Sequence, residues 1–175
     1  MSNENLIEKR FNRTLKFLAK VEPTGKRVLD LGTRNTLSAQ MESVGYIVEN
    51  TKGEDLDLAP EALKSYAEVD FVTAFEILEH LVSPFPLLRA LPAKRLVATV
   101  PLRLWFAKAY RHKTNKFDMH YHEFEDWQFD MLLEKAGWKI VHREKWTSPT
   151  YEIGFRPLLR FFYPRFYAVH AIRIE

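Results

Sequence analysis

The stretch Val28-Leu29-Asp30-Leu31-Gly32-Thr33-Arg34-Asn35-Thr36 determines how the rest of the chain is interpreted. It is a short apolar run that stops on an acid, and a glycine and small polar residues follow. Apolar residues then recur at helical spacing until Gly45. The pattern predicts a strand, a tight turn and a helix, which together open a nucleotide-binding α/β unit. In such a unit the turn's backbone amides and the helix N-terminus face a cofactor at the carboxyl end of the strand.

The turn lacks the G-x-G-x-x-G array of dinucleotide-binding proteins, because Gly32 is its only glycine. Its acid and glycine instead resemble motif I of class I S-adenosylmethionine-dependent methyltransferases, acid-x-Gly-x-Gly-x-Gly. Arg34 and Thr36 stand where that motif has its second and third glycines. The resemblance implies that the acid, Asp30, contacts the methionine part of the cofactor and serves the ligand rather than the core. A buried strand that runs into a helix without any ligand would have a similar sequence.

A second segment extends the resemblance. Residues 69–75 are nearly continuous in apolar side chains, as expected of a central parallel strand that is buried on both faces. The segment Asp-x-Val-x-x-x-Glu-x-Leu-Glu-His-Leu, from Asp70 to Leu81 with a proline soon after it, is similar to motif IV of small-molecule methyltransferases. The resemblance covers roughly residues 25–145. It implies methyl transfer from S-adenosylmethionine to a small-molecule oxygen, nitrogen or carbon.

Length and hydrophobic periodicity predict one α/β domain over residues 1–175, with a leading helix in 1–22 and an α/β core in 26–175. We expect a Rossmann-like, doubly wound, mainly parallel seven-stranded sheet with an antiparallel last strand. The expected strands lie at 28–31, 46–50, 54–58, 69–75, 95–101, 138–146 and 166–174. The expected later helices lie at 60–66, around 87–91 and at 123–136.

The leading helix, residues 4–20, is amphipathic. Its apolar stripe consists of Leu6, Ile7, Phe11, Leu15 and Leu18. We prefer the interpretation in which this stripe packs against the edge of the sheet and the basic residues of the helix are solvated. The alternative is a lid over the cofactor, which leading helices of methyltransferases often provide.

Most of the expected cofactor-binding residues lie at the ends of predicted strands. Glu49 follows Asp30 by 19 residues, close to the offset at which an acid receives ribose hydroxyls in Rossmann-type sites. Arg34 either pairs with the carboxylate of the cofactor or obstructs its pocket, in which case the domain is an inactive binding or scaffold module. The complete expected set is Asp30, Gly32, Arg34, Asn35, Glu49, Asp57, Phe75 and Glu76.

The general-base candidates are His120 and His122, since the resemblance places the loop after the 95–101 strand over the methyl donor. Alternatively, one of these histidines caps the 123–136 helix. For Glu79 and His80 we favour local hydrogen bonding over catalysis. A metal site is not expected, because zinc sites usually need three or four ligands and the chain has neither cysteine nor an H-E-x-x-H array.

Two segments, 102–121 and 155–167, mix aromatic and basic side chains. Such a mixture suits single-stranded nucleic acid, an aromatic acid, a lipid head group or a membrane surface. The competing interpretation, which we prefer, is that these aromatics belong mostly to the core. The net charge of +3 is too small to imply nucleic acid. We therefore expect a small-molecule substrate and no nucleic-acid partner.

The composition indicates a folded globular protein, with 46% hydrophobic and 14% aromatic residues. The absence of cysteine excludes disulfides, thiolate metal sites and cysteine nucleophiles. The N-terminus shows no apolar stretch of the signal-peptide type, and no run approaches the ~18 apolar residues of a membrane span. A cytoplasmic protein without a transmembrane segment is the expectation.

Overall fold

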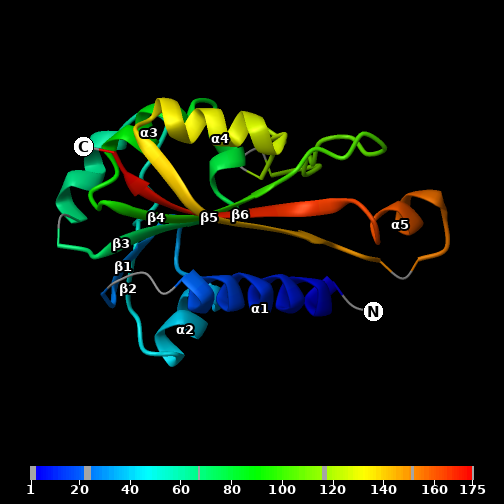
Figure 1. Cartoon of the computed structure of the whole chain (residues 1–175), viewed down its shortest axis with the longest axis horizontal. Helices are drawn as coiled ribbons and strands as arrows, with labels where there is room; N and C mark the ends of the chain where they lie inside the picture. The colour runs from blue at the N-terminus through cyan, green and yellow to red at the C-terminus, as the bar shows by residue number, and fades with distance from the viewer. Residues whose placement is uncertain (1–2, 22–24, 67, 116–117, 151, 175) are drawn as a thin grey trace.

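The computed structural model describes residues 3–21, 25–66, 68–115, 118–150 and 152–174. They form a six-stranded sheet in the order β2-β1-β3-β4-β6-β5, with helices on both faces (Figure 1). The strands are β1 (Arg27–Asp30), β2 (Ile47–Asn50), β3 (Phe71–Phe75), β4 (Arg95–Pro101), β5 (Trp138–Thr147) and β6 (Pro164–Arg173). The α-helices are α1 (Asn3–Val21), α2 (Thr36–Ser43), α3 (Pro84–Ala90), α4 (Asp126–Lys135) and α5 (Phe155–Leu159). Two 3₁₀ helices, η1 (Pro60–Tyr66) and η2 (Leu78–His80), complete the described elements.

The strand directions confirm a mainly parallel sheet with an antiparallel last strand. Strands β1 to β4 pair in parallel, whereas β6 is antiparallel to both β4 and β5. Strand β5 therefore runs in the same direction as β4. The carboxyl ends of β1, β3, β4 and β5 consequently lie at one edge of the sheet, together with the start of β6.

The prediction of a seventh strand at residues 54–58 is wrong. The segment forms turns in which the Asp55 carboxylate accepts hydrogen bonds from the backbone amides two and three residues later. The Asp57 carboxylate accepts two more, from the amides of Val82 and Ser83 at the start of α3. These polar side chains satisfy local amides and hold the segment against α3, so it does not extend the sheet. Strand β2 remains the edge strand.

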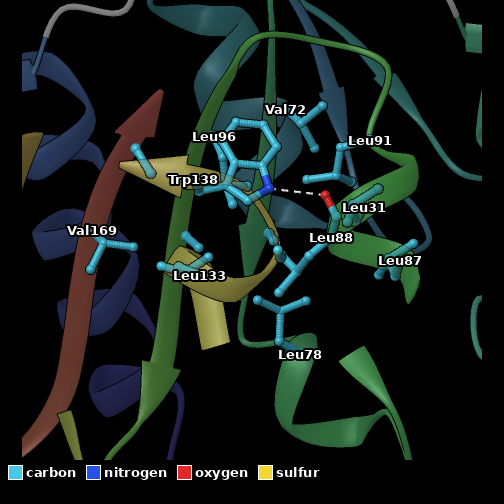
Figure 2. Close-up of a cluster of buried hydrophobic side chains, with 14 of the residues drawn as sticks. Leu31, Val72, Leu78, Leu87, Leu88, Leu91, Leu96, Leu133, Trp138 and Val169 are labelled. Atoms are coloured by element: carbon cyan, nitrogen blue, oxygen red, sulfur yellow. Dashed lines mark hydrogen bonds between the residues drawn. The ribbon is translucent and has the colours of Figure 1, made fainter. Parts of the chain in front are cut away.

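Helices α3 and α4 cover one face of the sheet (Figure 1), and the larger core cluster lies between these helices and the sheet. Figure 2 shows leucine and valine side chains of the strands and helices gathered around Trp138. The indole nitrogen of Trp138 donates a hydrogen bond of 2.9 Å to the carbonyl of Leu88, so the large side chain is buried without an unpaired donor. This cluster fixes α3 and α4 on the sheet and thereby positions the loops at its carboxyl edge.

Helices α1 and α2 cover the opposite face (Figure 1). Phe17 and Leu18, in the second half of α1, are buried against Val28, Met41 and Phe71. Helix α1 therefore packs on a face of the sheet, and the expectation that it packs against the edge is wrong. The reason is that its most apolar turn lies near its C-terminus. The first half of the helix extends over the carboxyl edge of the strands.

The expectation that the aromatics of the two mixed segments are mostly core is also wrong. Phe106 is buried, but Trp105, Tyr110 and Tyr121 are exposed, and exposed aromatics also surround α5. Phe117 lies outside the described residues. Within the described part of the chain, none of the helices combines the length and apolar character needed to cross a membrane.

Candidate functional site

A cavity of about 320 Å³ lies at the carboxyl ends of β1 and β3, beneath the first half of α1. Its size falls at the lower end of the range of small-molecule pockets. The structure brings four of the predicted cofactor-binding residues to its wall: Asp30, Asn35, Phe75 and Glu76. Helix α1 contributes Ile7, Arg10, Phe11 and Thr14, and Leu31 and Leu37 complete the lining. The same helix is thus anchored in the core at one end and covers a cavity at the other.

Asp30 is only 3% exposed and lies in a network of side chains. Its Oδ1 accepts a hydrogen bond of 2.7 Å from the Thr73 hydroxyl, and its Oδ2 accepts bonds from Ser38 at 2.9 Å and from Asn50 at 3.0 Å. Burial raises the pKa of Asp30, and these three hydrogen bonds oppose that rise. The Asp30 carboxylate therefore does have partners in the protein interior, and the expectation that it would serve a ligand rather than the core is wrong on that point.

Ser38, Asn50 and Thr73 were not among the residues predicted for this site. Asp30 pairs in register with Asn50 on one neighbouring strand and with Thr73 on the other. Residues in register point to the same face of a sheet, so the three side chains meet. The available signal was a polar residue near the end of each predicted strand. Its use required the strand order and the register, which periodicity does not provide.

Gly32 shapes the turn after β1. Its φ is +99°, a conformation that favours glycine, and its amide donates a hydrogen bond of 2.8 Å to the Thr51 hydroxyl. A Cβ at this position would lie 3.3 Å from Cδ1 of Ile77. The backbone angle therefore favours glycine here, and a Cβ would in addition require a small shift of the Ile77 side chain.

Arg34 points away from the cavity. Its guanidinium forms two hydrogen bonds, of 2.6 and 2.5 Å, with the carboxylate of Glu42 on the exposed side of α2. Neither Arg34 nor Thr36 has a positive φ, so the turn has formed without the strain that two missing glycines would suggest. Asn35 caps α2, because its side-chain oxygen accepts hydrogen bonds from the backbone amides two and three residues later.

Glu49 and Asp57 are not among the residues that line the cavity. Glu49 is exposed on the edge strand β2, where alternation places it on the face opposite to Asn50. Asp57 holds the amides of Val82 and Ser83. Both acids therefore lie apart from the four predicted residues that line the cavity.

Glu76, directly after β3, has an unusual backbone. Its φ is +55°, and it is the only non-glycine residue in the described chain with a positive φ. Its Oε2 lies 3.6 Å from the Arg10 guanidinium, and its Oε1 is buried without a hydrogen bond of ordinary geometry from the described residues. Burial raises the pKa of Glu76, and the charge of Arg10 opposes that rise. The Thr99 hydroxyl lies near this carboxylate and also opposes the rise in its pKa, although it makes no hydrogen bond of ordinary geometry with it. A strained backbone and a buried oxygen without such a bond are typical of a functional position.

The two base candidates have different surroundings. His120 is largely buried, and its Nδ1 lies 3.3 Å from the carboxylate of Glu123. His122 turns outward, its Nε2 donates a hydrogen bond of 3.1 Å to the carbonyl of Val82, and its ring stacks on Phe124. His122 therefore holds a loop in place, whereas His120 belongs to a buried polar cluster at the same edge of the sheet as the cavity.

A second cavity, of about 420 Å³, adjoins the first and shares Ile7 and Arg10 with it. Its wall combines two aromatic side chains, Trp146 and Phe166, with the basic face of α1. The charged residues that line it in the described chain are all basic: Lys9, Arg10, Arg13 and Lys16. The arrangement suits a negatively charged molecule with a flat apolar part.

No family model and no curated protein matches the chain. Solved structures do match at low sequence identity. The 1,6-didemethyltoxoflavin-N1-methyltransferase of Burkholderia thailandensis, solved with its substrate and S-adenosylhomocysteine, has a TM-score of 0.65 at 19% identity and covers 94% of this chain and 78% of its own. The magnesium protoporphyrin IX methyltransferase of Synechocystis, solved with S-adenosylhomocysteine, has a TM-score of 0.58 at 17% identity, and the match covers 96% of this chain and 84% of that one. The [4+2]-cyclase SpnF has a TM-score of 0.63 at 13% identity, and the match covers 94% of this chain and 81% of that one.

Proposed function

We propose that this chain, which has the fold of class I S-adenosylmethionine-dependent methyltransferases, binds S-adenosylmethionine beneath α1 and transfers its methyl group to a small molecule. The observation that carries this proposal is the cavity of about 320 Å³ at the carboxyl ends of β1 and β3. Ligands of open α/β sheets bind in this position. The cavity wall holds two carboxylates, the buried Asp30 and the partly buried Glu76.

The residues of the wall fit the charges of this cofactor. Its sulfonium and ammonium groups are positive, and Glu76 offers a buried oxygen that has no hydrogen bond of ordinary geometry in the described chain. Its carboxylate is negative, and the guanidinium of Arg10 lies in the same wall. Phe75 provides an aromatic surface for the adenine. The charged groups and the adenine of the cofactor thus have partners of suitable chemistry in the wall.

S-adenosylmethionine supplies a methyl group bonded to a positively charged sulfur, which a lone pair of the acceptor displaces in line. The chain itself needs to hold donor and acceptor in this geometry and to exclude water. Ile7 and Phe11 of α1 cover the cavity for that purpose. A base is needed where the acceptor must lose a proton, and His120 is the candidate at this edge of the sheet.

The adjoining cavity is the proposed acceptor site. It shares Arg10 with the cavity of about 320 Å³ proposed for the methyl donor, the donor cavity, so donor and acceptor would meet beside this side chain. Arg13 and Lys16 favour a carboxylate or phosphate on the acceptor, and Trp146 and Phe166 favour a flat ring system. The proposed acceptor is therefore an anionic aromatic molecule.

A domain of this fold that binds without methylating is the second candidate. The observation in its favour is the position of Glu49, the acid predicted to receive the ribose hydroxyls, which is exposed on β2 and does not line the cavity. The [4+2]-cyclase SpnF, whose structure matches this chain, illustrates that the fold does not determine the reaction.

Calorimetric titration with S-adenosylmethionine and S-adenosylhomocysteine tests the proposal. We expect one saturable site for each ligand, and Phe75→Ala should weaken binding by about tenfold or more. The matched control is Phe85→Ala, since Phe85 lies on α3 and outside the cavity lining. Absence of binding at millimolar concentrations would contradict the proposal. Binding without methyl transfer to a panel of aromatic carboxylates and phosphates would favour the second candidate.

A further inference from the structure

A buried carboxylate faces two imidazole rings next to the donor cavity. Glu79, in η2, is only 1% exposed. Its Oε1 lies 3.9 Å from Nε2 of His80 and 4.0 Å from Nε2 of His120. One ligand atom from each of the three side chains can be chosen so that all three atoms lie within 4.8 Å of one another. The three residues come from two segments of the chain. These segments meet because the backbone carbonyl of Glu79 accepts hydrogen bonds from the amides of Tyr121 and His122, which holds the His120 loop against η2.

Both imidazole rings are held so that Nε2 offers a lone pair toward Glu79. Nδ1 of His80 lies 3.0 Å from the carbonyl of Met119, and Nδ1 of His120 lies 3.3 Å from the carboxylate of Glu123. A carbonyl can only accept a hydrogen bond, and so can an ionised carboxylate. Each Nδ1 therefore donates, and in the neutral ring Nε2 carries no proton. This is the arrangement in which metal-binding histidines are usually oriented.

The outer partners are themselves fixed. Arg165 donates a hydrogen bond of 2.7 Å to Glu123. Burial opposes ionisation of Glu123, but its hydrogen bonds with His120 and Arg165 outweigh that effect and lower its pKa to about 2. The chain Arg165–Glu123–His120 thus holds one of the two rings rigidly.

Glu79 lacks the partners that a buried carboxylate normally has. Neither of its oxygens accepts a hydrogen bond of ordinary geometry from any residue that the structure describes. The separations of 3.9 and 4.0 Å are too long for direct hydrogen bonds to the two rings. They are close to the spacing of about 3.4 Å between two ligand atoms that share one tetrahedral ion with bonds of about 2.1 Å.

We propose that Glu79, His80 and His120 bind one divalent first-row transition-metal ion, with Zn²⁺ as the reference ion. Two imidazole nitrogens and one carboxylate favour such an ion over Mg²⁺, which prefers oxygen ligands. Three protein ligands leave a coordination position open. Glu76, which lines the donor cavity, lies three residues before Glu79 in the chain. None of the three residues is among those that line the two cavities, so ion binding does not depend on the proposed function. An ion bound to Nε2 of His120 would exclude this ring as the general base.

The test uses the whole chain after dialysis against a chelator, with no S-adenosylmethionine present. Co²⁺ should give visible absorption bands that saturate at one equivalent, and Zn²⁺ should displace it. Mg²⁺ should bind at least a hundredfold more weakly than Zn²⁺. Glu79→Gln, His80→Asn and His120→Asn should each weaken Co²⁺ binding by a hundredfold or more, and Glu123→Gln by about ten- to a hundredfold.

His112→Asn is the matched control, because His112 is exposed and lies outside this cluster. Its Nδ1 accepts the amide of Asn115 within a turn, and the variant should bind Co²⁺ like the wild type. The proposal is overturned if the wild type shows no saturable Co²⁺ or Zn²⁺ site, or if Glu79→Gln binds Co²⁺ unchanged. Binding of Mg²⁺ as tight as that of Zn²⁺ would overturn the assignment to a transition metal. Titration of Glu79→Gln with S-adenosylhomocysteine separates this result from a failure of the proposed function, because donor binding should persist.

Discussion

Asp30 and Glu79 are two buried carboxylates near the same edge of the sheet, but their surroundings differ. Asp30 accepts three hydrogen bonds, from Thr73, Ser38 and Asn50. Glu79 accepts none of ordinary geometry from the described residues and instead faces His80 and His120. Burial raises the pKa of both.

The hydrogen-bonding groups around a buried acid determine whether its burial is favourable in the protein alone. Three donors converge on Asp30, so its carboxylate helps to hold the turn in place whether or not a ligand lies in the cavity. Glu79 meets groups that are themselves acceptors, so a cation or a proton is needed to make its burial favourable. We therefore expect substitutions at the two positions to have opposite effects on stability.

Asp30→Ala should give the largest effect, a loss of about 3 kcal/mol in the free energy of unfolding. The buried hydroxyls of Thr73 and Ser38 lose an acceptor, and Asn50 loses one of several, while each buried loss costs on the order of 1 kcal/mol or more. Urea unfolding of the wild type and the variant measures this. Asp30→Asn keeps an acceptor oxygen and should lose clearly less. Equal stability of Asp30→Ala and wild type would show that the network contributes little.

Glu79→Gln should stabilise the metal-free chain near neutral pH by about 1–2 kcal/mol, because an amide replaces a poorly solvated acid. Since the pKa of Glu79 is raised in the folded state, the folded chain binds more protons than the unfolded chain. The contribution of Glu79 to stability is therefore fully present below the ordinary pKa of glutamate and is lost as pH rises through the folded pKa.

The stability difference between Glu79→Gln and the wild type should consequently widen from pH 4 toward neutrality. Thermal unfolding of both proteins in the presence of a chelator, over a series of pH values, measures it. A difference that is constant with pH would mean that the Glu79 carboxyl does not titrate abnormally. Glu68→Gln, at an exposed carboxylate, is the control and should show no such trend.

Arg34→Ala should have the smallest effect, a change of no more than about 0.5 kcal/mol in stability and less than about threefold in affinity for S-adenosylhomocysteine. The Arg34–Glu42 pair is exposed, and exposed ion pairs contribute little. A double-mutant cycle with Glu42→Ala measures the pair directly. A large gain in ligand affinity would show instead that Arg34 obstructs the cavity, and a large loss would show that Arg34 binds the ligand.

The sequence alone predicted the elements whose signals are local. The apolar run of β3 and the acid, glycine and helix after β1 are patterns of neighbouring residues, and the structure has both elements in place. Asp30, Asn35, Phe75 and Glu76 were also predicted as one site. The structure brings these four residues to one cavity, because the carboxyl ends of parallel strands meet at one edge whatever lies between the strands in the chain.

Tertiary structure alone decided the rest. The expected strand at 54–58 does not form because the carboxylates of Asp55 and Asp57 accept hydrogen bonds from backbone amides. The amide bound by Asp55 is nearby in the chain, and the amide bound by Asp57 lies in the loop before α3. Glu79 and His120 are distant in the chain and meet because the backbone carbonyl of Glu79 accepts two amides of the 121–122 loop. Local periodicity carries information about the direction of a side chain. It carries none about which distant loop closes over that side chain, because this depends on how the whole sheet packs.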